Sequence, residues 1–392
     1  MADKARTVKK EPLIRISKRV EVSAKYKMLL TAASILIALI ISGLLIVFLG
    51  RNPVEFFTQV IVGSFGSAIN LKLLLRIFIP LLITALGLSI AFKMRFWNIG
   101  GEGQFIMGAL ISMTFALLIG DSMGHFGVVV VIAAGALGGG LYALIPALFK
   151  VRFNTNETLM TLMLNYIALY LVQFFLYGGP KFYVAEGPGI PTFKRIDQAL
   201  WLTDFKSGLF SVDTSIIIAV VLLLFIFVYL KYTKHGYEIS VVGDSPNTAV
   251  YSGMNVKAIT IRTIFISGAV VGLAGALQLT GSAAGHTLAV NITGGVGWTA
   301  IIVAWLAKLN PLGISVVSLL MSVLEKGCGY ARTKMGISDA VSDIIQGLIL
   351  FTVLACDFFI NYKITVRKKS RNTETDREDG SSASVQKGGE NA

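Results

Sequence analysis

The chain has 392 residues, of which 54% are hydrophobic and only 15% are charged, and its mean hydropathy is +0.72. This composition excludes an ordinary soluble domain, which would carry more charge. Several apolar runs of about 20 residues predict membrane-spanning helices, and the apolar–polar alternation of a membrane β-barrel is absent. The net charge of +13 does not indicate nucleic-acid binding, because the basic residues gather in short loops and near the two ends. We therefore expect an all-α polytopic membrane protein.

The apolar runs predict about ten membrane-spanning helices. Lys and Arg mark alternate loops, which by the positive-inside rule places both termini in the cytoplasm. Residues 178–213 are expected to form the longest outer loop and residues 326–338 a shorter one. The expected spans are 29–49, 73–92, 99–119, 128–149, 157–177, 214–230, 258–280, 294–307, 311–324 and 340–360.

The flanking segments are polar and complete the expected organisation. Residues 1–28 form a basic cytoplasmic arm, and residues 29–361 form the transmembrane domain. Residues 362–392 are expected to be a disordered cytoplasmic tail, because they are polar and poor in aromatic residues. Within the membrane domain, Gly135-xxx-Gly139 and Gly268-xxx-Gly272 favour close helix packing.

A weak internal echo relates two glycine-rich stretches. Asn98–Gly103 has the sequence NIGGEG, and Asn291–Gly297 has the sequence NITGGVG. The first opens an outward span and the second an inward span, as two five-span halves of inverted orientation would require. Because glycine-rich stretches often match by chance, the 5+5 inverted repeat is a hypothesis.

The first of these stretches places Asn98, Glu102 and Gln104 at the mouth of a span. A carboxylate facing lipid is costly, so Glu102 must face protein, water or the interface. One interpretation is a gate of the translocation pathway, or a joint. The other is a plain helix start, with Glu102 favoured by the helix dipole. The sequence leaves both open.

A second polar stretch precedes and enters the span at 157–177. Asn154 and Glu157 have capping-box spacing, so Glu157 could simply cap the helix. Thr161 and Asn165 share one helix face. Such a polar stripe either bonds a neighbouring helix or lines a polar path, and the first interpretation is favoured for any single residue.

The polar loop from Lys231 to Lys257 separates two apolar spans. The sequence predicts a break at Gly243–Pro246, with Asp244 or Ser245 capping a short helix that ends near Gly253. A short surface helix between two membrane helices suits docking of a partner, although an ordinary cytoplasmic loop is the alternative. The candidate docking residues are Gly236, Glu238, Gly243, Asp244, Pro246, Asn247 and Gly253.

Several catalytic motifs are missing from the sequence. It contains no phosphate-binding loop of the Gly-x-x-x-x-Gly-Lys-Ser/Thr type, no His-Glu-x-x-His zinc motif and no Gly-x-Ser-x-Gly elbow. Cys328 and Cys356 make no metal-ligand pattern. We therefore expect no enzyme activity, no metal and no cofactor on this chain.

Three stretches together resemble the inner-membrane permease subunits of bacterial ABC importers that handle ribose-type sugars, nucleosides and branched-chain amino acids. They are Trp97–Gln104, Asn156–Tyr166 and Gly236–Val256. Asn156-Glu157 followed by Thr-Leu-Met resembles the nucleoside-uptake branch. Ser245 departs from the family pattern, where Asn is expected before the Pro.

The resemblance implies a set of partners. They are a cytoplasmic ATPase that binds ATP and magnesium, a second homologous permease, and an extracytoplasmic substrate-binding protein. It also implies that the loop at 236–256 docks into the ATPase. Membrane lipid is the expected surrounding, the inner membrane the expected location, and nucleic acid is not an expected partner.

The function expected is thus the translocation of nucleosides or related small polar solutes. The alternatives are a permease for simple sugars such as ribose, an ion-coupled carrier acting alone, and a non-catalytic membrane scaffold or channel without saturable transport.

Overall fold

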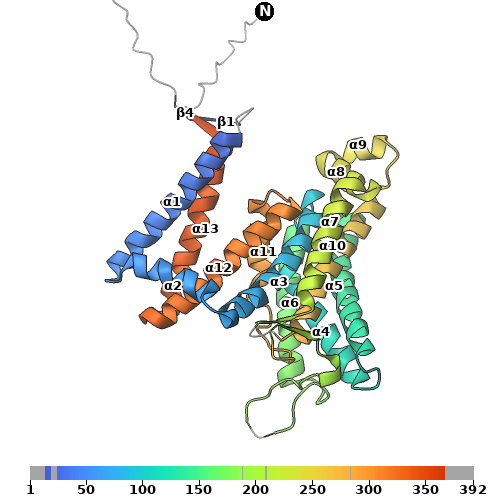
Figure 1. Cartoon of the computed structure of the whole chain (residues 1–392). Helices are drawn as coiled ribbons and strands as arrows, with labels where there is room; N and C mark the ends of the chain where they lie inside the picture. The colour runs from blue at the N-terminus through green and yellow to red at the C-terminus, as the bar shows by residue number, and fades with distance from the viewer. Residues whose placement is uncertain (1–13, 19–23, 188, 208–209, 283, 367–392) are drawn as a thin grey trace, which may run out of the picture. The chain divides into compact units, whose positions relative to one another are not determined.

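The structure, a computed structural model, is almost wholly helical over the residues that it describes (Figure 1). The chain divides into two compact units, residues 40–349 and residues 1–39 with 350–392. Helices α1 (Ala24–Phe48) and α13 (Asp339–Asn361) each run from one unit into the other. The described residues are 14–18, 24–187, 189–207, 210–282 and 284–366.

In the unit that holds both chain ends, strand β1 (Ile14–Lys18) pairs antiparallel with strand β4 (Tyr362–Val366). The sequence assigned 362–366 to a disordered tail, and this assignment is wrong because β1 supplies these residues with backbone partners. The remainder of the expected tail, 367–392, and residues 1–13 of the expected arm lie outside the described residues.

The larger unit contains the remaining elements, and helix dominates it. One short hairpin and one 3-10 turn interrupt the helices. The elements are α2 (Pro53–Phe65), α3 (Ala68–Lys93), α4 (Gly101–Ile119), α5 (Phe126–Phe153), α6 (Glu157–Tyr177), η1 (Gln198–Leu200), β2 (Asp204–Ser207), β3 (Phe210–Asp213), α7 (Ser215–Tyr232), α8 (Lys234–Asp244), α9 (Pro246–Tyr251), α10 (Val256–Thr280), α11 (Val296–Leu306) and α12 (Pro311–Met335).

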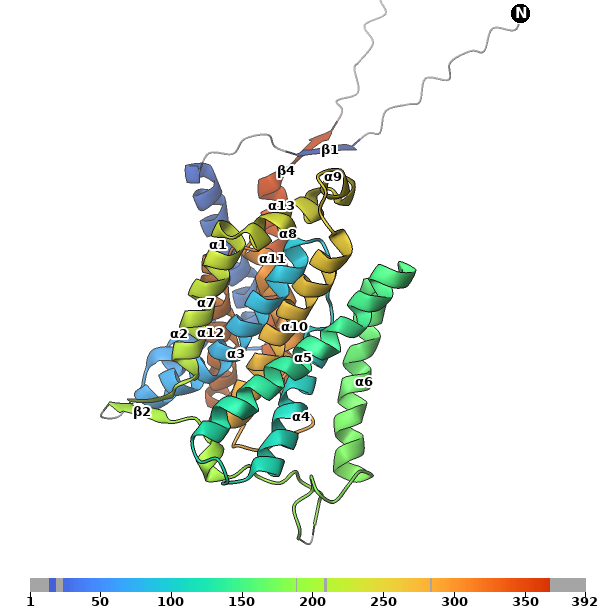
Figure 2. The same cartoon turned by 90° about the vertical axis from the view of Figure 1, so that its right-hand side faces the viewer.

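The core lies where α10 packs against α3, α4 and α5 (Figure 2). Glycines make this packing close: a Cβ on Gly272 would lie 2.5 Å from the carbonyl oxygen of Gly135, and a Cβ on Gly139 would lie 2.5 Å from the Cα of Gly272. Small residues let helix backbones approach and gain van der Waals contact where lipid supplies no hydrophobic drive. The packing role expected for these glycines is confirmed.

Seven described helices are long and apolar enough to cross a membrane, or eight if the bent pair Leu36–Phe48 and Pro53–Phe65 is one span. The polytopic all-α class is confirmed, whereas the expected count of about ten spans is not. α11 has only 11 residues, too few to span alone. The expected outer loop at 326–338 is wrong, because α12 continues without a break to Met335.

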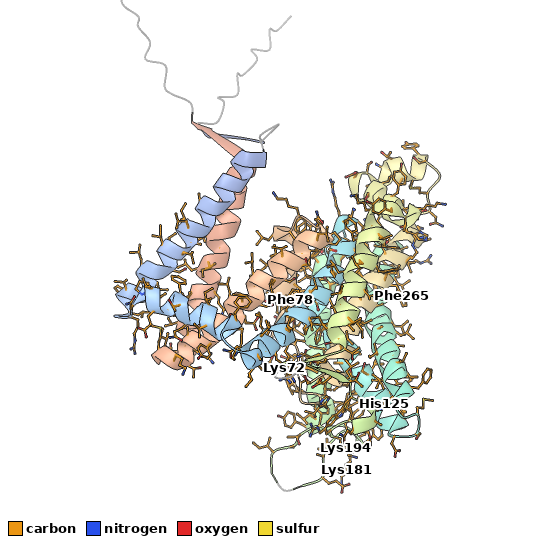
Figure 3. The ribbon with its side chains drawn as sticks, in the orientation of Figure 1. Lys72, Phe78, His125, Lys181, Lys194 and Phe265 are labelled. Carbon is orange, nitrogen blue, oxygen red and sulfur yellow. The ribbon has the colours of Figure 1, made fainter. Side chains whose placement is uncertain are left out.

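The two ends of the larger unit differ in character. α8 and α9 lie at one end of α7 and α10, whereas the loop at 178–213 lies at the other (Figures 1 and 2). Lys181 and Lys194 on that loop lie at the same end as His125, as the side-chain view shows (Figure 3). This arrangement separates the candidate docking loop from the expected outer face.

Candidate functional site

The loop between α7 and α10 folds as a helical hairpin built on local caps. The Thr233 hydroxyl accepts from the backbone N–H of Gly236, which starts α8. The Ser245 hydroxyl accepts from the N–H of Thr248 at 3.3 Å, and Pro246 takes the first position of α9. Ser245, not Asp244, is therefore the cap. Gly253 has a φ of +75°, a conformation that favours glycine.

An ion cluster ties this hairpin to the neighbouring span. The Glu238 carboxylate accepts from the Arg262 guanidinium at 2.7 Å, and His235 and Lys234 approach it to 3.4 Å and 3.9 Å. The hydrogen bond from Arg262 is the main cause that lowers the pKa of Glu238. Because Glu238 stands on α8 and Arg262 on α10, the pair joins the hairpin to the core helix.

Close backbone contacts fix the hairpin further. A Cβ on Gly236 would lie 2.5 Å from the carbonyl oxygens of Tyr229 and Leu230, so only glycine fits there without a shift. A Cβ on Gly243 would overlap the carbonyl oxygen of Lys93. The loop thus rests on the end of α3 as well as on α7 and α10.

The outer side of the hairpin is open. Asp244, Pro246 and Asn247 are exposed. Tyr251 is 92% exposed and Val250 is 60% exposed. The sequence-based prediction did not select these two residues, although an aromatic and an aliphatic residue in a polar loop are the signal that could have found them. Adjacent exposed apolar side chains on a polar element are typical of a contact surface.

A cavity of about 540 Å³ lies beside the hairpin. The Lys150 ammonium on its wall pairs with the Glu157 carboxylate at 2.9 Å. Asn156, rather than Asn154, caps α6, because its side chain accepts from the N–H groups of Thr158 and Leu159. Glu157 therefore belongs with this cavity, and the capping-box interpretation is wrong.

Asn98 and Gln104 form a closed buried pair before and within α4. The Asn98 carbonyl oxygen accepts from the Gln104 amide at 3.0 Å and from the Gly100 N–H at 3.0 Å, and the Asn98 amide donates to the Gln104 oxygen at 3.2 Å. Both side chains are almost fully buried. Buried amides with satisfied partners rigidify a structure. Asn98 and Gln104 therefore favour the interpretation of this stretch as a joint.

Two residues of α6 extend this network. The Asn165 oxygen accepts from the Gly103 N–H at 2.8 Å, and its amide donates to the Ile99 carbonyl at 2.9 Å. The Thr161 hydroxyl accepts from the Ile99 N–H at 3.1 Å. The polar stripe therefore bonds the neighbouring chain segment before α4 and helps to hold α6 against it.

Glu102 joins two helix N-termini. It lies in the first turn of α4, and its carboxylate accepts from the Thr293 hydroxyl and from the Gly297 N–H at 2.8 Å. Gly297 is in the first turn of α11, which has no side-chain cap of its own. A carboxylate stabilises the positive end of a helix dipole, and here one carboxylate serves two. The two echoing stretches thus lie beside each other, while the inverted repeat stays a hypothesis.

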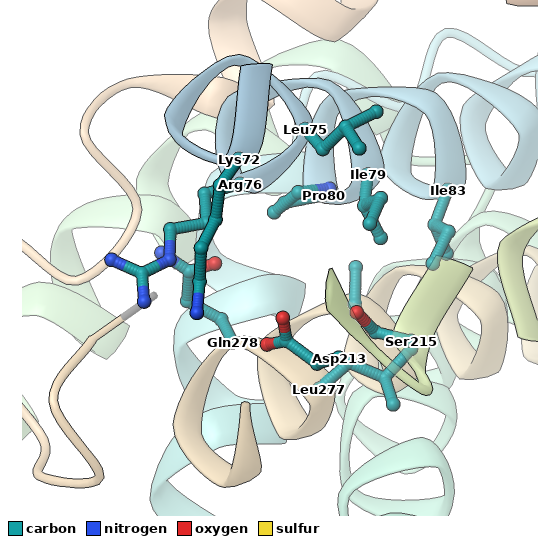
Figure 4. A pocket seen from close by; sticks show the side chains of 11 residues that line it. Lys72, Leu75, Arg76, Ile79, Pro80, Ile83, Asp213, Ser215, Leu277 and Gln278 are labelled. Atoms are coloured by element: carbon teal, nitrogen blue, oxygen red, sulfur yellow. The ribbon is translucent and has the colours of Figure 1, made fainter. Parts of the chain in front are cut away.

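A small polar cluster lies between the start of α3 and the end of α10 (Figure 4). Arg76 donates to the Ser282 hydroxyl at 2.8 Å, and Asp213 accepts from the Ser282 N–H at 2.8 Å. Within the described residues, the Nε atom of Arg76 and the Oε1 atom of Gln278 have no hydrogen-bond partner. The cavity of about 10 Å³ has room for about one water and none for a solute.

A larger polar cavity of about 650 Å³ adjoins α12 and the start of α13. Its lining includes Glu325, Lys326, Tyr330, Asp343 and Gln346. The sequence-based prediction did not select Glu325, Lys326 and Tyr330 as site residues, because it ended the span at Leu324 and placed a loop at 326–338. Asp343 and Gln346 fall in the predicted span 340–360 and were not selected either. The charged pair in the middle of one continuous apolar helix was the signal.

Comparison with known proteins places the chain in a family. Residues 70–354 match the family of branched-chain amino acid transport system permease components. The chain is 27% identical to a nucleoside ABC transporter permease protein from Lactococcus lactis, over 91% of this chain and 98% of that protein. It is 26% identical to a guanosine ABC transporter permease protein from Bacillus subtilis, over 87% and 97% of the two chains.

A glucose ABC transporter permease protein from Haloferax volcanii is also similar, with 26% identity over 85% of this chain and 88% of that protein. No solved structure matches the chain significantly. The family match covers most of the membrane domain, including the α8–α9 hairpin and the network around Glu102. The chain therefore belongs to the family of permease components typified by the branched-chain amino acid transport system.

Proposed function

We propose that this chain is the permease subunit of an ATP-driven importer and that it translocates nucleosides across the inner membrane. The observation that carries the proposal is the α8–α9 hairpin, which exposes Val250 and Tyr251 and is tied to the core through Glu238 and Arg262. An unaided carrier has no need of an apolar contact surface on such a hairpin. The similar proteins from two bacteria are permeases of nucleoside and guanosine ABC transporters.

The partners are those that an importer of this type requires. A separate cytoplasmic ATPase binds ATP and magnesium and docks on α9, with both termini of this chain on the same side of the membrane. A second permease completes the pathway. Lactococcus lactis and Bacillus subtilis each have a second similar permease protein of the same transporter type, which supports this pairing. An extracytoplasmic binding protein delivers the solute to the opposite face.

The geometry suggests how ATPase motion reaches the pathway. A push on α9 moves α8, to which it is joined at Ser245, and the Glu238–Arg262 pair carries the motion to α10. α10 packs against α3, α4 and α5 over close glycine contacts, so these helices respond together. Glu102 links α4 to α11, which brings the short helix into the same movement.

Replacement of residues in the α8–α9 hairpin tests the role of the docking loop. Residues 243–255 are replaced by a neutral Gly-Ser linker of equal length, and membrane abundance and copurification of the ATPase are measured together with uptake of labelled guanosine. We expect normal insertion, loss of the ATPase from the purified complex and loss of uptake. Normal uptake by this variant would contradict the proposal.

Glucose is the second candidate solute, because a similar archaeal permease belongs to a glucose transporter. Uptake of labelled guanosine, uridine and glucose by the complete importer separates the two. Competition by unlabelled nucleoside but not by glucose supports the nucleoside assignment. Glucose uptake without nucleoside uptake would replace it.

A further inference from the structure

The 650 Å³ cavity between α3, α11, α12 and α13 is open on one side and has a strongly polar lining. It is lined on one side by Glu325 and Thr333 of α12 and on another by Asp343 and Gln346 of α13. Glu325 lies in the middle of α12, a 25-residue helix of membrane-spanning length. The volume falls in the range of pockets that enclose a small organic molecule.

Three charged side chains of this cavity have no opposite charge beside them among the described residues. Within the described part of the chain, the side chains of Glu325, Lys326 and Asp343 form no ion pair or hydrogen bond. The Lys334 ammonium lies 5.8 Å from the centroid of the Tyr330 ring. An ionised side chain at membrane depth is costly unless it faces water, a partner or a solute. We therefore expect these side chains to face water or a polar solute.

The start of the short helix α11 borders the cavity. Its 11 residues span about 16 Å, roughly half the hydrocarbon thickness. Gly294, which directly precedes the cap of α11, and Thr299, in its second turn, line the cavity. Glu102 holds the same helix start from the α4 side. Solute sites of transporters commonly lie at the broken end of such a half-length helix.

We propose that this cavity is the solute chamber of the permease and that it binds a neutral nucleoside. The proposal rests on the nucleoside function proposed above. The Glu325 and Asp343 carboxylates accept hydrogen bonds from the sugar hydroxyls, and the Gln346 amide bonds the polar edge of the base. The Tyr330 ring, half-buried in the wall, offers the base an apolar face.

The lining of the cavity carries charges of both signs. Two carboxylates line the cavity together with three cationic side chains, Lys326, Arg332 and Lys334. A nucleoside offers donors and acceptors without net charge and suits such a mixed lining.

Access to the cavity is tested by cysteine labelling in the intact importer, with Cys328→Ala and Cys356→Ala as the background. Thr333→Cys and Gln346→Cys are exposed to a charged, membrane-impermeant methanethiosulfonate reagent, with and without guanosine. Leu320→Cys is the matched control, because Leu320 is exposed on α12 but does not line the cavity. We expect labelling at the two cavity positions only, slowed about fivefold or more by guanosine.

The solute contacts are tested by guanosine uptake through Glu325→Gln and Asp343→Asn, with the exposed Glu55→Gln as control. We expect about a tenfold or greater loss of uptake for the first two, with normal membrane abundance, and uptake within about twofold of the unaltered protein for the control. Normal uptake by both, or labelling that guanosine does not slow, overturns the chamber assignment and leaves the proposed function standing. An unaltered importer that takes up no nucleoside overturns both.

Discussion

At the scale of single residues, the Glu102 side chain connects the starts of α4 and α11 and so helps to fix their relative position. Its carboxylate stands in the first turn of α4 and accepts from Thr293 and Gly297 at the start of α11. The close approach depends on glycine, since a Cβ on Gly297 would overlap the Glu102 backbone. Glu102 is therefore better described as a joint than as a simple helix start.

Replacement of Glu102 measures this joint. In Glu102→Gln the amide oxygen can still accept, whereas Glu102→Leu leaves the donors of Thr293 and Gly297 unpaired. We expect losses in the free energy of unfolding of about 1 kcal/mol for Gln and about 2–3 kcal/mol for Leu. Thermal unfolding in detergent checks this, with Glu55→Gln as the control. A Leu variant as stable as the unaltered protein would contradict the joint.

His286 gives the outer loops a pH dependence. Its ring stacks on Trp201 with centroids 4.0 Å apart, and the Arg195 guanidinium lies 4.5 Å from the Trp201 centroid. Burial, and secondly the charge of Arg195, hold the pKa of His286 below its ordinary value of 6.5. The hydrogen bond with the Thr280 backbone and the charges of Asp213 and Asp204 act in the opposite direction and are weaker. The folded loop thus keeps His286 neutral, while the unfolded loop binds a proton more readily.

The contact between the loop segments that carry Trp201 and His286 is therefore fully stable above about pH 6.5. It loses stability as the pH falls through the pKa that His286 has in the folded protein. Hydrogen exchange of residues 193–203 and 284–290 at pH 7.5 and 5.5, corrected for intrinsic rates, measures this loss. In His286→Phe, which keeps a ring for Trp201, the extra opening at low pH should disappear. An equal pH response in both proteins would assign it to another group.

At the scale of elements, the α8–α9 hairpin works as a lever only if it is coupled to α10. Glu238 and Arg262 supply that coupling, whereas the Arg95–Asp244 pair at 3.7 Å has both side chains largely exposed and contributes little. Coupling energy is measured by a double-mutant cycle, because single truncations also leave a charge unpaired.

The cycle uses Glu238→Ala, Arg262→Ala and both together in the complete importer, with Lys181→Ala on the opposite loop as control. We expect each single variant to lower uptake per ATP hydrolysed by about threefold to tenfold, and the double variant to lose little more than either. If the loss of uptake in the double variant equals the product of the two single losses, Glu238 and Arg262 act separately.

At the scale of the whole molecule, the crossing of α5 and α10 holds the core together. Gly139 and Gly272 face each other with no room for a side chain. Gly272→Leu forces the helices apart, and we expect a loss of about 1–3 kcal/mol or more in the free energy of unfolding and a smaller yield of folded protein. Size-exclusion profiles and thermal unfolding in detergent measure both.

The matched control is Gly347→Ala, another helical glycine, whose added Cβ would meet nothing within 4 Å. It should leave stability unchanged or raise it slightly, because alanine has the higher helix propensity. An equally stable Gly272→Leu variant would mean that the two helices do not need their close contact.

Features that depend on local chemistry could be predicted from the amino-acid sequence without the fold. Apolar length predicts the spans, because backbone groups in lipid must bond internally. The Ser245–Pro246 cap and Gly253 predicted α9, since caps and left-handed conformations are set by neighbouring residues. The small-residue patterns of α5 and α10 likewise predicted that these helices pack closely.

Which polar residues meet depends on helix packing and could not be predicted in the same way. Asn98 and Gln104 bond each other, whereas Thr161 and Asn165 bond the backbone of Ile99 and Gly103. Nothing in the spacing of these residues could distinguish this arrangement from an open path. The charges of Glu325 and Lys326 ended the predicted span early, because hydropathy measures a charge as an interruption wherever it points. In the folded protein both residues line a cavity, which is formed by the packing of α12 beside helices distant in the sequence.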